Sequence, residues 1–223
     1  YSDFREYSKE FVSKIREIAD CIAQADVLSS LAEVAVENNF TKPEIDESGD
    51  FIVKNGRHPV LEKILPLGDY VSNDLELKSN STDSTQFMIL TGPNMAGKST
   101  YMRQNALIAL LAQIGSWVPA DYLKLGVIDK IFTRVGASDD LTLGQSTFMV
   151  EMIETAYILN SATEKSFILL DEIGRGTSTY DGVAIAWSVA EFIATKIKAR
   201  CIFATHYHEL NVMSNTYPQI KNF

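Results

Sequence analysis

The residues with the clearest potential for chemistry lie between positions 92 and 99, where the sequence reads GPNMAGKS. Its two glycines, followed by Lys98 and Ser99, match the pattern of a phosphate-binding loop at every fixed position. The N–H groups of such a loop surround phosphate oxygens, the lysine reaches the terminal phosphates, and the hydroxyl binds Mg2+. This segment therefore predicts a nucleoside triphosphate site with Mg2+. A turn with an incidental lysine is the weaker alternative.

A pair of carboxylates, Asp171 and Glu172, follows the apolar run FILL at 167–170. Open α/β sheets bind ligands beyond the carboxyl ends of their strands, so a carboxylate at that place points toward a ligand. We expect Asp171 to hold Mg2+, directly or through water, and Glu172 to act as a general base on the attacking water. Alone, such a pair could equally cap a helix. Together with the phosphate-binding loop it indicates hydrolysis.

A histidine, His206, follows another apolar run that ends at Ala204. Its ring could donate a hydrogen bond to an anionic oxygen, and so contact a terminal phosphate or orient a water molecule. The alternative is a histidine that caps the following helix, and the pattern alone favours that alternative.

The segment STFMVEM begins at Ser146 and Thr147. Ser and Thr before a periodic apolar run are typical of a helix N-cap. A helix N-terminus also attracts anions, so the same residues could face a phosphate on a neighbouring subunit. These residues leave both interpretations open. The polar, glycine-rich stretch 174–181 is predicted to be a loop whose hydroxyls build turns or face a partner.

Strand-like and helix-like segments alternate around these residues. The expected strands are 86–90, 128–135, 167–170 and 201–204, and the expected helices are 98–114, 147–160, 181–197 and one that starts near His208. This alternation predicts an α/β fold with a mainly parallel sheet covered by helices on both faces.

The first 40 residues have a different pattern. Apolar residues recur three or four apart from Phe4 to Val34, which predicts helix over 4–37. The pattern fits either one long arm or two helices joined near Ala25 and Asp26. The polar stretch 38–49, which contains a proline, is predicted to be a linker. We therefore expect a helical segment at 1–40 and a larger domain at 41–223.

Composition excludes several functions for this chain. The net charge is −9, from 20 basic and 29 acidic residues without a basic run, so a DNA-phosphate surface is not expected here. No apolar run is long enough to cross a bilayer, so no membrane partner is expected, and no signal peptide is apparent. Cys21 and Cys201 are expected to be reduced. Both termini resemble cut ends of a longer chain.

Four stretches together resemble the MutS family, whose ATPase belongs to the ABC-type group of P-loop NTPases. They read TGPNMAGKSTYMRQ from 91, STFMVEM from 146, DEIGRGTSTYDG from 171 and ATHYHEL from 204, in the family's order. The likeness runs from about Gly56 to the C-terminus, and the preceding helices resemble the end of the family's core and lever region. SMC-like proteins and MutS relatives without mismatch recognition are rivals, which Asn94, Met95 and the text GTST at 176–179 disfavour.

The resemblance implies a role for each matching residue. Asp171, with Ser99, would bind Mg2+; Glu172 would be catalytic and His206 the switch histidine. Ser146 and Thr147 would complete the nucleotide site of the opposite subunit. The phosphate loop would comprise Gly92, Pro93, Asn94, Met95, Ala96, Gly97, Lys98, Ser99 and Thr100, with Asn94 near the γ-phosphate as a further catalytic residue.

Two positions match the family less closely. Tyr70 resembles the aromatic residue that the family stacks on adenine, although its neighbours match poorly, and an ordinary half-buried tyrosine is the alternative. Ala96 stands where many relatives have glycine, which is acceptable if the backbone φ there is negative.

The resemblance implies a Mg2+-dependent ATPase whose cofactors are ATP and Mg2+. ATP would drive switching of a dimer with a second copy of the module. Mismatched double-stranded DNA would bind through regions absent from this chain, and a MutL-type protein would act downstream. The text GQS at 144–146 resembles bacterial members, which favours a homodimer in the bacterial cytoplasm, at the nucleoid. A nucleotide-binding partner without catalysis is the rival from another class.

Overall fold

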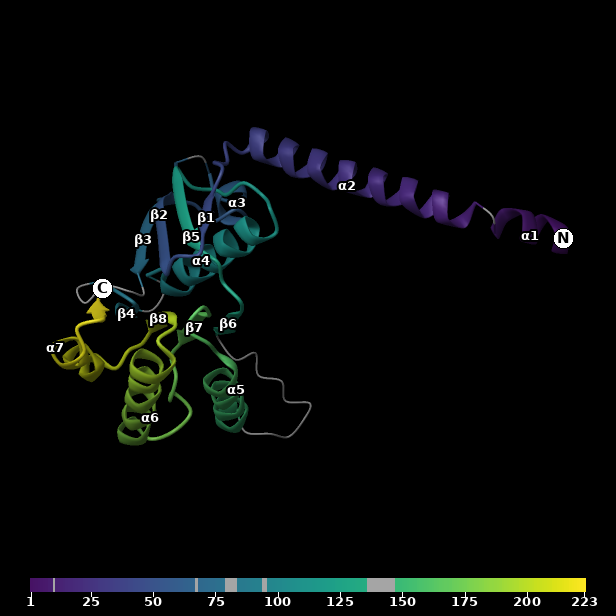
Figure 1. The fold of residues 1–223 in the computed structure, drawn as a ribbon. Coiled ribbons are helices and arrows are strands. Elements are labelled where there is room, and N and C mark those ends of the chain that lie inside the picture. The colour runs from purple at the N-terminus through teal and green to yellow at the C-terminus, as the bar shows by residue number, and fades with distance from the viewer. Residues whose placement is uncertain (10, 67, 79–83, 94–95, 136–146) are drawn as a thin grey trace. The chain divides into compact units, whose positions relative to one another are not determined.

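A computed structural model describes residues 1–223 except 10, 67, 79–83, 94–95 and 136–146 (Figure 1). The chain divides into two compact units, Tyr1–Phe40 and Thr41–Phe223. The first unit is helical, and the second contains all of the strands described.

The first unit contains α1, Ser2–Lys9, and α2, Val12–Glu37. The 26 residues of α2 extend about 39 Å at a rise of about 1.5 Å per residue. The helix runs unbroken through Ala25 and Asp26, so the alternative of two helices joined there is wrong. Its apolar residues are largely exposed, with Ala35 as the buried residue of the helix.

The second unit is built on a five-stranded sheet in which every described pairing is parallel, so the predicted α/β fold with a parallel sheet is confirmed. All four expected strands are present, and a short fifth strand near the C-terminus was not predicted. The strand order is β6, Ile131–Arg134; β7, Phe167–Asp171; β8, Arg200–Ala204; β4, Phe87–Leu90; and β9, Ile220–Asn222. The apolar runs form these strands because both faces of the sheet are covered.

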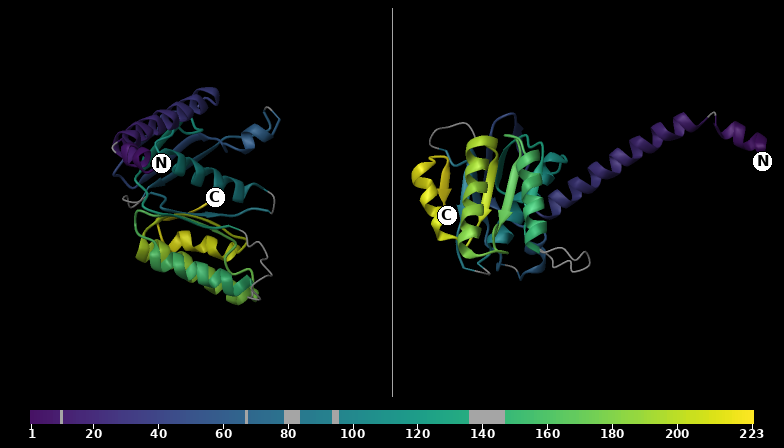
Figure 2. Two further views of the ribbon diagram at one scale, coloured as in Figure 1. Left: turned by 90° about the vertical axis from the view of Figure 1, so that its right-hand side faces the viewer. Right: turned by 90° about the horizontal axis from the view of Figure 1, so that it is seen from below.

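Helices cover one face of the parallel sheet (Figure 1). Ile168 and Leu170 of β7 and Phe203 of β8 pack in their apolar core. Figure 2 shows this layer from two further directions. Its elements are α5, Thr147–Ser161; α6, Thr179–Phe192, continued by the π-helical turn Ile193–Ile197; the 3-10 helix His208–Val212; and α7, Met213–Thr216.

The opposite face is covered differently from the prediction. One helix, α4, Lys98–Gln113, lies there beside a second, four-stranded sheet. Phe167 and Leu169, which alternate along β7 with the residues of the first face, pack in this second core. The elements of the second sheet, in order, are β1, Glu44–Asp46; β5, Tyr122–Gly126; β2, Asp50–Gly56; and β3, Asn73–Lys78; the four-residue helix α3, Leu61–Ile64, precedes β3 in the chain.

The second sheet corrects two predictions. Helices alone do not cover both faces of the parallel sheet, and the expected linker 38–49 includes strand β1, which pairs with β5. The strands β2 and β3 do carry a strand signal, since Phe51 and Val53, and likewise Leu75 and Leu77, are buried at alternate positions. Each alternation is too short to stand out from the polar residues around it.

A buried arginine, Arg200 at the start of β8, connects the two sheets. Its guanidinium donates to the carbonyl oxygens of Gly126 at 3.0 Å and Asp50 at 3.3 Å in the second sheet. It also donates to Lys165 O at 2.9 Å, before β7, and to Val127 O at 3.3 Å. Burial lowers the pKa of Arg200, and the carbonyl oxygens offset the cost of burying its charge.

None of the helices in the described part of the chain is long and apolar enough to cross a membrane.

Candidate functional site

The phosphate-binding loop lies between β4 and α4, as the sequence predicts. Gly97 has a φ of +94°, in the left-handed region that favours glycine, and it directly precedes the first residue of α4. This conformation turns the chain from the loop into the helix, so the first N–H groups of α4 are directed toward the loop. Asn94 and Met95 lie outside the described residues.

Lys98 is bonded to its own loop. Its Nζ donates to Gly92 O at 2.7 Å and to Pro93 O at 2.9 Å. Among the residues that the structure describes, no carboxylate lies within ion-pair distance of this ammonium group. A cation held only by main-chain carbonyl oxygens can exchange these neutral partners for an anion, and charge-assisted bonds to the anion are stronger.

Ser99 and Asp171 meet although they are 72 positions apart in the sequence. Ser99 Oγ, in the first turn of α4, donates to Asp171 Oδ2 at 2.6 Å at the end of β7. Both groups offer hard oxygen ligands of the kind that Mg2+ takes. The described residues contain no group of three or more His, Cys, Asp or Glu side chains placed to hold a metal. An ion here would therefore take further ligands from water or from a bound phosphate, as Mg2+ commonly does.

Glu172 has a strained backbone, and side chains of two other residues are bonded to its carboxylate. Its φ of +55° is uncommon for a residue with a side chain, and its N–H donates to Ala204 O at 2.9 Å. Its carboxylate accepts a hydrogen bond from the Arg175 guanidinium and is bonded to Nε2 of the His206 ring. The structure thus brings Glu172 and His206 together. The sequence analysis did not single out Arg175. Its place three residues after Glu172 was a usable signal, because oppositely charged side chains at that spacing often pair.

The His206 ring is bonded to the Glu172 carboxylate. The capping interpretation would instead require a bond from this ring to a main-chain N–H at the start of the following helix. The following 3-10 helix begins at His208 after Tyr207, without a side-chain cap. His208 lies on the surface in the first turn of that helix.

The serine and threonine segment is only partly described. Thr147 is the first residue of α5, and Ser146 lies outside the described residues. In the loop after Glu172, Ser178 Oγ accepts from Asp181 N at 3.3 Å and so caps α6. The hydroxyls of this loop were expected either to build local structure or to face a partner, and Ser178 builds local structure.

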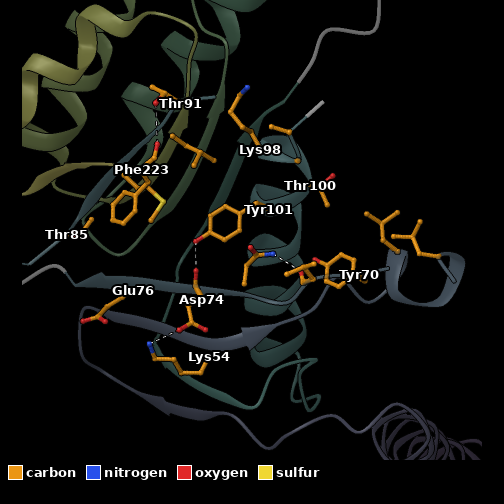
Figure 3. A pocket seen from close by; sticks show the side chains of 18 of the residues that line it. Lys54, Tyr70, Asp74, Glu76, Thr85, Thr91, Lys98, Thr100, Tyr101 and Phe223 are labelled. Carbon is orange, nitrogen blue, oxygen red and sulfur yellow. Dashed lines mark hydrogen bonds and ion pairs between the residues drawn. The ribbon is translucent and has the colours of Figure 1, made fainter. Parts of the chain in front are cut away.

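A cavity of about 1200 Å³ lies beside the start of α4 (Figure 3). Ala96, Gly97, Lys98 and Thr100 line it near the loop, and Tyr70 lines it between α3 and β3. Its volume is sufficient for a nucleotide-sized ligand.

Tyr70 is half-buried, and its hydroxyl donates to Gln104 Oε1 on α4. Burial raises the pKa of the Tyr70 phenol, so the hydroxyl remains a donor at neutral pH. The ring is half-buried and also forms part of the cavity wall. This position is compatible both with an ordinary half-buried tyrosine and with a ring that stacks on a base.

Comparisons with known proteins agree with the motifs. The family model described as MutS domain V matches residues 88–223. Proteins named DNA mismatch repair protein MutS are similar over nearly the whole chain. They include one from Thermodesulfovibrio yellowstonii, 59% identical over 96% of this chain and 25% of its own length; one from Flavobacterium johnsoniae, 54% identical over 96% and 24%; and one from Clostridium perfringens, 52% identical over 100% and 24%. The chain spans about a quarter of the length of these relatives.

Proposed function

Because the chain belongs to the MutS family, we propose that it is the P-loop ATPase module, of the ABC type, of a DNA mismatch repair protein. The observation that carries the proposal is the contact between Ser99 Oγ and Asp171 Oδ2 at 2.6 Å. It joins the end of the phosphate-binding loop to the carboxyl end of β7, another strand of the same parallel sheet, and α/β sheets bind ligands at that edge.

ATP would bind with its phosphates on the loop. The N–H groups at the start of α4 would surround phosphate oxygens, and Lys98 would exchange Gly92 O and Pro93 O for them. Ser99 and Asp171 would hold Mg2+, which neutralises charge on the phosphates when it is bound. Tyr70 would stack on the base at the wall of the same cavity.

Hydrolysis would depend on Glu172 and His206. Glu172 would orient and deprotonate the attacking water, and the adjacent His206 would contact the terminal phosphate. Arg175 also bonds Glu172, so this carboxylate must be shared or released before it accepts a proton. Asn94 would act near the γ-phosphate.

Two modules would close over two ATP molecules, each supplying Ser146 and Thr147 to the opposite site. ATP would favour the closed dimer because its terminal phosphate contacts both copies there. The whole protein would bind mismatched double-stranded DNA outside this chain, whose net charge of −9 does not suit DNA, and would act with a MutL-type protein. The named relatives are bacterial, which supports a homodimer in the cytoplasm, at the nucleoid.

The test compares ATP binding, Mg2+-dependent phosphate release and molecular mass for the chain and a Glu172→Gln variant. We expect the variant to bind ATP and to lose about 100-fold or more in turnover, the usual size of a general-base contribution. Glu164→Gln, which changes an exposed acid, is the matched control. Binding without turnover in the unchanged chain would favour a nucleotide-binding partner, and absence of binding would refute the proposal.

A further inference from the structure

Gly174, two residues after Glu172, is bonded on both sides by side chains from other elements. Its N–H donates to Glu151 Oε1 on α5 at 2.5 Å. Its carbonyl oxygen accepts from the Tyr207 hydroxyl, beyond the end of β8, at 2.9 Å. Each main-chain polar group of this residue is therefore held by a different part of the fold.

Close packing leaves little room for movement around Gly174. Its φ is +89°, and a Cβ atom there would lie 2.6 Å from Gly182 O at the start of α6. A Cβ atom on Gly182 would in turn overlap the Tyr207 hydroxyl, and one on Gly176 would lie 2.8 Å from Phe148 Cβ on α5. The loop after Glu172 thus makes direct backbone contact with α5, α6 and Tyr207.

Glu151 is an unusual residue to find at this contact. It is 6% exposed, and its nearest described cation is Arg134 on β6, which is 7% exposed and 3.9 Å away. Burying a carboxylate is unfavourable unless hydrogen bonds compensate, so a merely structural position would favour an apolar residue. Burial, followed by the Glu151 charge, raises the pKa of Tyr207, which keeps its hydroxyl protonated as the donor to Gly174.

The three elements that meet at Gly174 carry the groups of the proposed hydrolysis. Glu172 is two residues away on the same loop, His206 directly precedes Tyr207, and α5 begins at Thr147. A shift of α5 would move Gly174 through Glu151, and with it the bonded pair Glu172 and His206.

We propose that Glu151 and Tyr207 are positioning residues, which hold Gly174 so that Glu172 lies in its hydrolytic geometry and follows the position of α5. This inference rests on the proposed ATPase function. On this inference, the buried Glu151 carboxylate affects the rate of the chemical step and does not contribute to nucleotide binding.

The test measures kcat, KM, ATP affinity and thermal stability for Glu151→Ala, Glu151→Gln and Tyr207→Phe. Loss of either bond displaces Glu172, and a displacement of about 1 Å can lower a rate about 100-fold. We expect kcat to fall about 10- to 100-fold in Glu151→Ala, and less in Tyr207→Phe, with KM changed less than about twofold. Glu151→Gln keeps an acceptor for Gly174 N–H and should recover most of the rate. Glu154→Gln is the control, because Glu154 also pairs with Arg134, at 2.9 Å, but is half exposed.

A second measurement separates positioning from a general loss of structure. Glu151→Ala and Tyr207→Phe are each combined with Glu172→Gln and followed in single-turnover reactions. Positioning through Glu172 predicts no further loss in the double variants, since groups that act as a unit are not additive. An undiminished further loss, or an unchanged kcat in a folded Tyr207→Phe variant, would overturn the inference. Failure of the proposed function gives a different result, because the unchanged chain would then show no turnover.

Discussion

The two ends of the candidate site are built in different ways. At the proposed phosphate end, the groups lie at the carboxyl end of β7 or at the start of α4, and each is hydrogen-bonded within the site. They are Lys98, Ser99, Asp171 and Glu172. At the proposed base end, Tyr70 lies between α3 and β3 and its hydroxyl donates to Gln104 on α4. Parallel strands bring several polar groups to one edge, whereas the proposed base contact depends on one ring at the cavity wall. Substitutions should therefore have larger effects at the phosphate end.

The largest effect is expected for Asp171→Asn. The amide can still accept from Ser99, so the fold should persist, but the negative charge that attracts Mg2+ is lost. Since a bound metal contributes several kcal/mol to phosphoryl transfer, Mg2+-dependent turnover should fall about 1000-fold. Phosphate release across a Mg2+ titration checks this, with Asp20→Asn on α2 as the control. If Asp171→Asn responded to Mg2+ as the unchanged chain does, Asp171 would not hold the metal, and larger effects at the phosphate end would no longer be expected.

The next effect is expected for Lys98→Met, which keeps an unbranched apolar stem and removes the ammonium group. Hydrogen bonds from a charged group contribute about 1.5–3 kcal/mol, so ATP affinity should fall by about 10- to 100-fold. Calorimetric titration with ATP measures the loss, and Lys63→Met, at an exposed lysine, is the control. The affinity for AMP, which lacks the terminal phosphates, should fall much less than the affinity for ATP. An equal loss for both nucleotides would contradict the placement of Lys98.

A smaller effect is expected for Tyr70→Leu, which removes the aromatic surface at the base end. Stacking of a base on an aromatic ring contributes about 1–3 kcal/mol, so ATP affinity should fall about tenfold. Inorganic triphosphate, which has no base, should bind the variant as it binds the unchanged chain. Equal losses for ATP and triphosphate would show that Tyr70 does not contact the base.

The smallest effect is expected for Tyr70→Phe, which keeps the ring and removes the bond to Gln104. A neutral hydrogen bond contributes about 0.5–1.5 kcal/mol to stability, so the melting temperature should fall by a few degrees. ATP affinity should change by about threefold or less, and by less than in Tyr70→Leu. A larger loss of affinity in Tyr70→Phe would mean that the hydroxyl, and not the ring, carries the contact.

Much of the parallel sheet could be predicted because its signals are local. The apolar runs that became β4, β7 and β8 are contiguous, and the glycine at Gly97 precedes a helix where a left-handed residue is needed. The four-stranded sheet escaped prediction because the buried residues of β2 and β3 alternate with more exposed ones and form no contiguous buried run. Strand β2 is bonded to β3 on one side and to β5, about 70 positions away, on the other.

The candidate site divides in the same way. The sequence alone determined the loop, because residue type and spacing match a specific pattern, and it placed the carboxylate pair and the histidine directly after apolar runs. The roles expected for His206 and the carboxylates depended on the loop and on the family resemblance. Only the tertiary structure decided that Ser99 bonds Asp171, that Arg175 and His206 both bond Glu172, and that the buried Glu151 holds Gly174. These contacts join elements distant in the chain, and their geometry depends on how the sheet and helices pack together. No local periodicity encodes that packing.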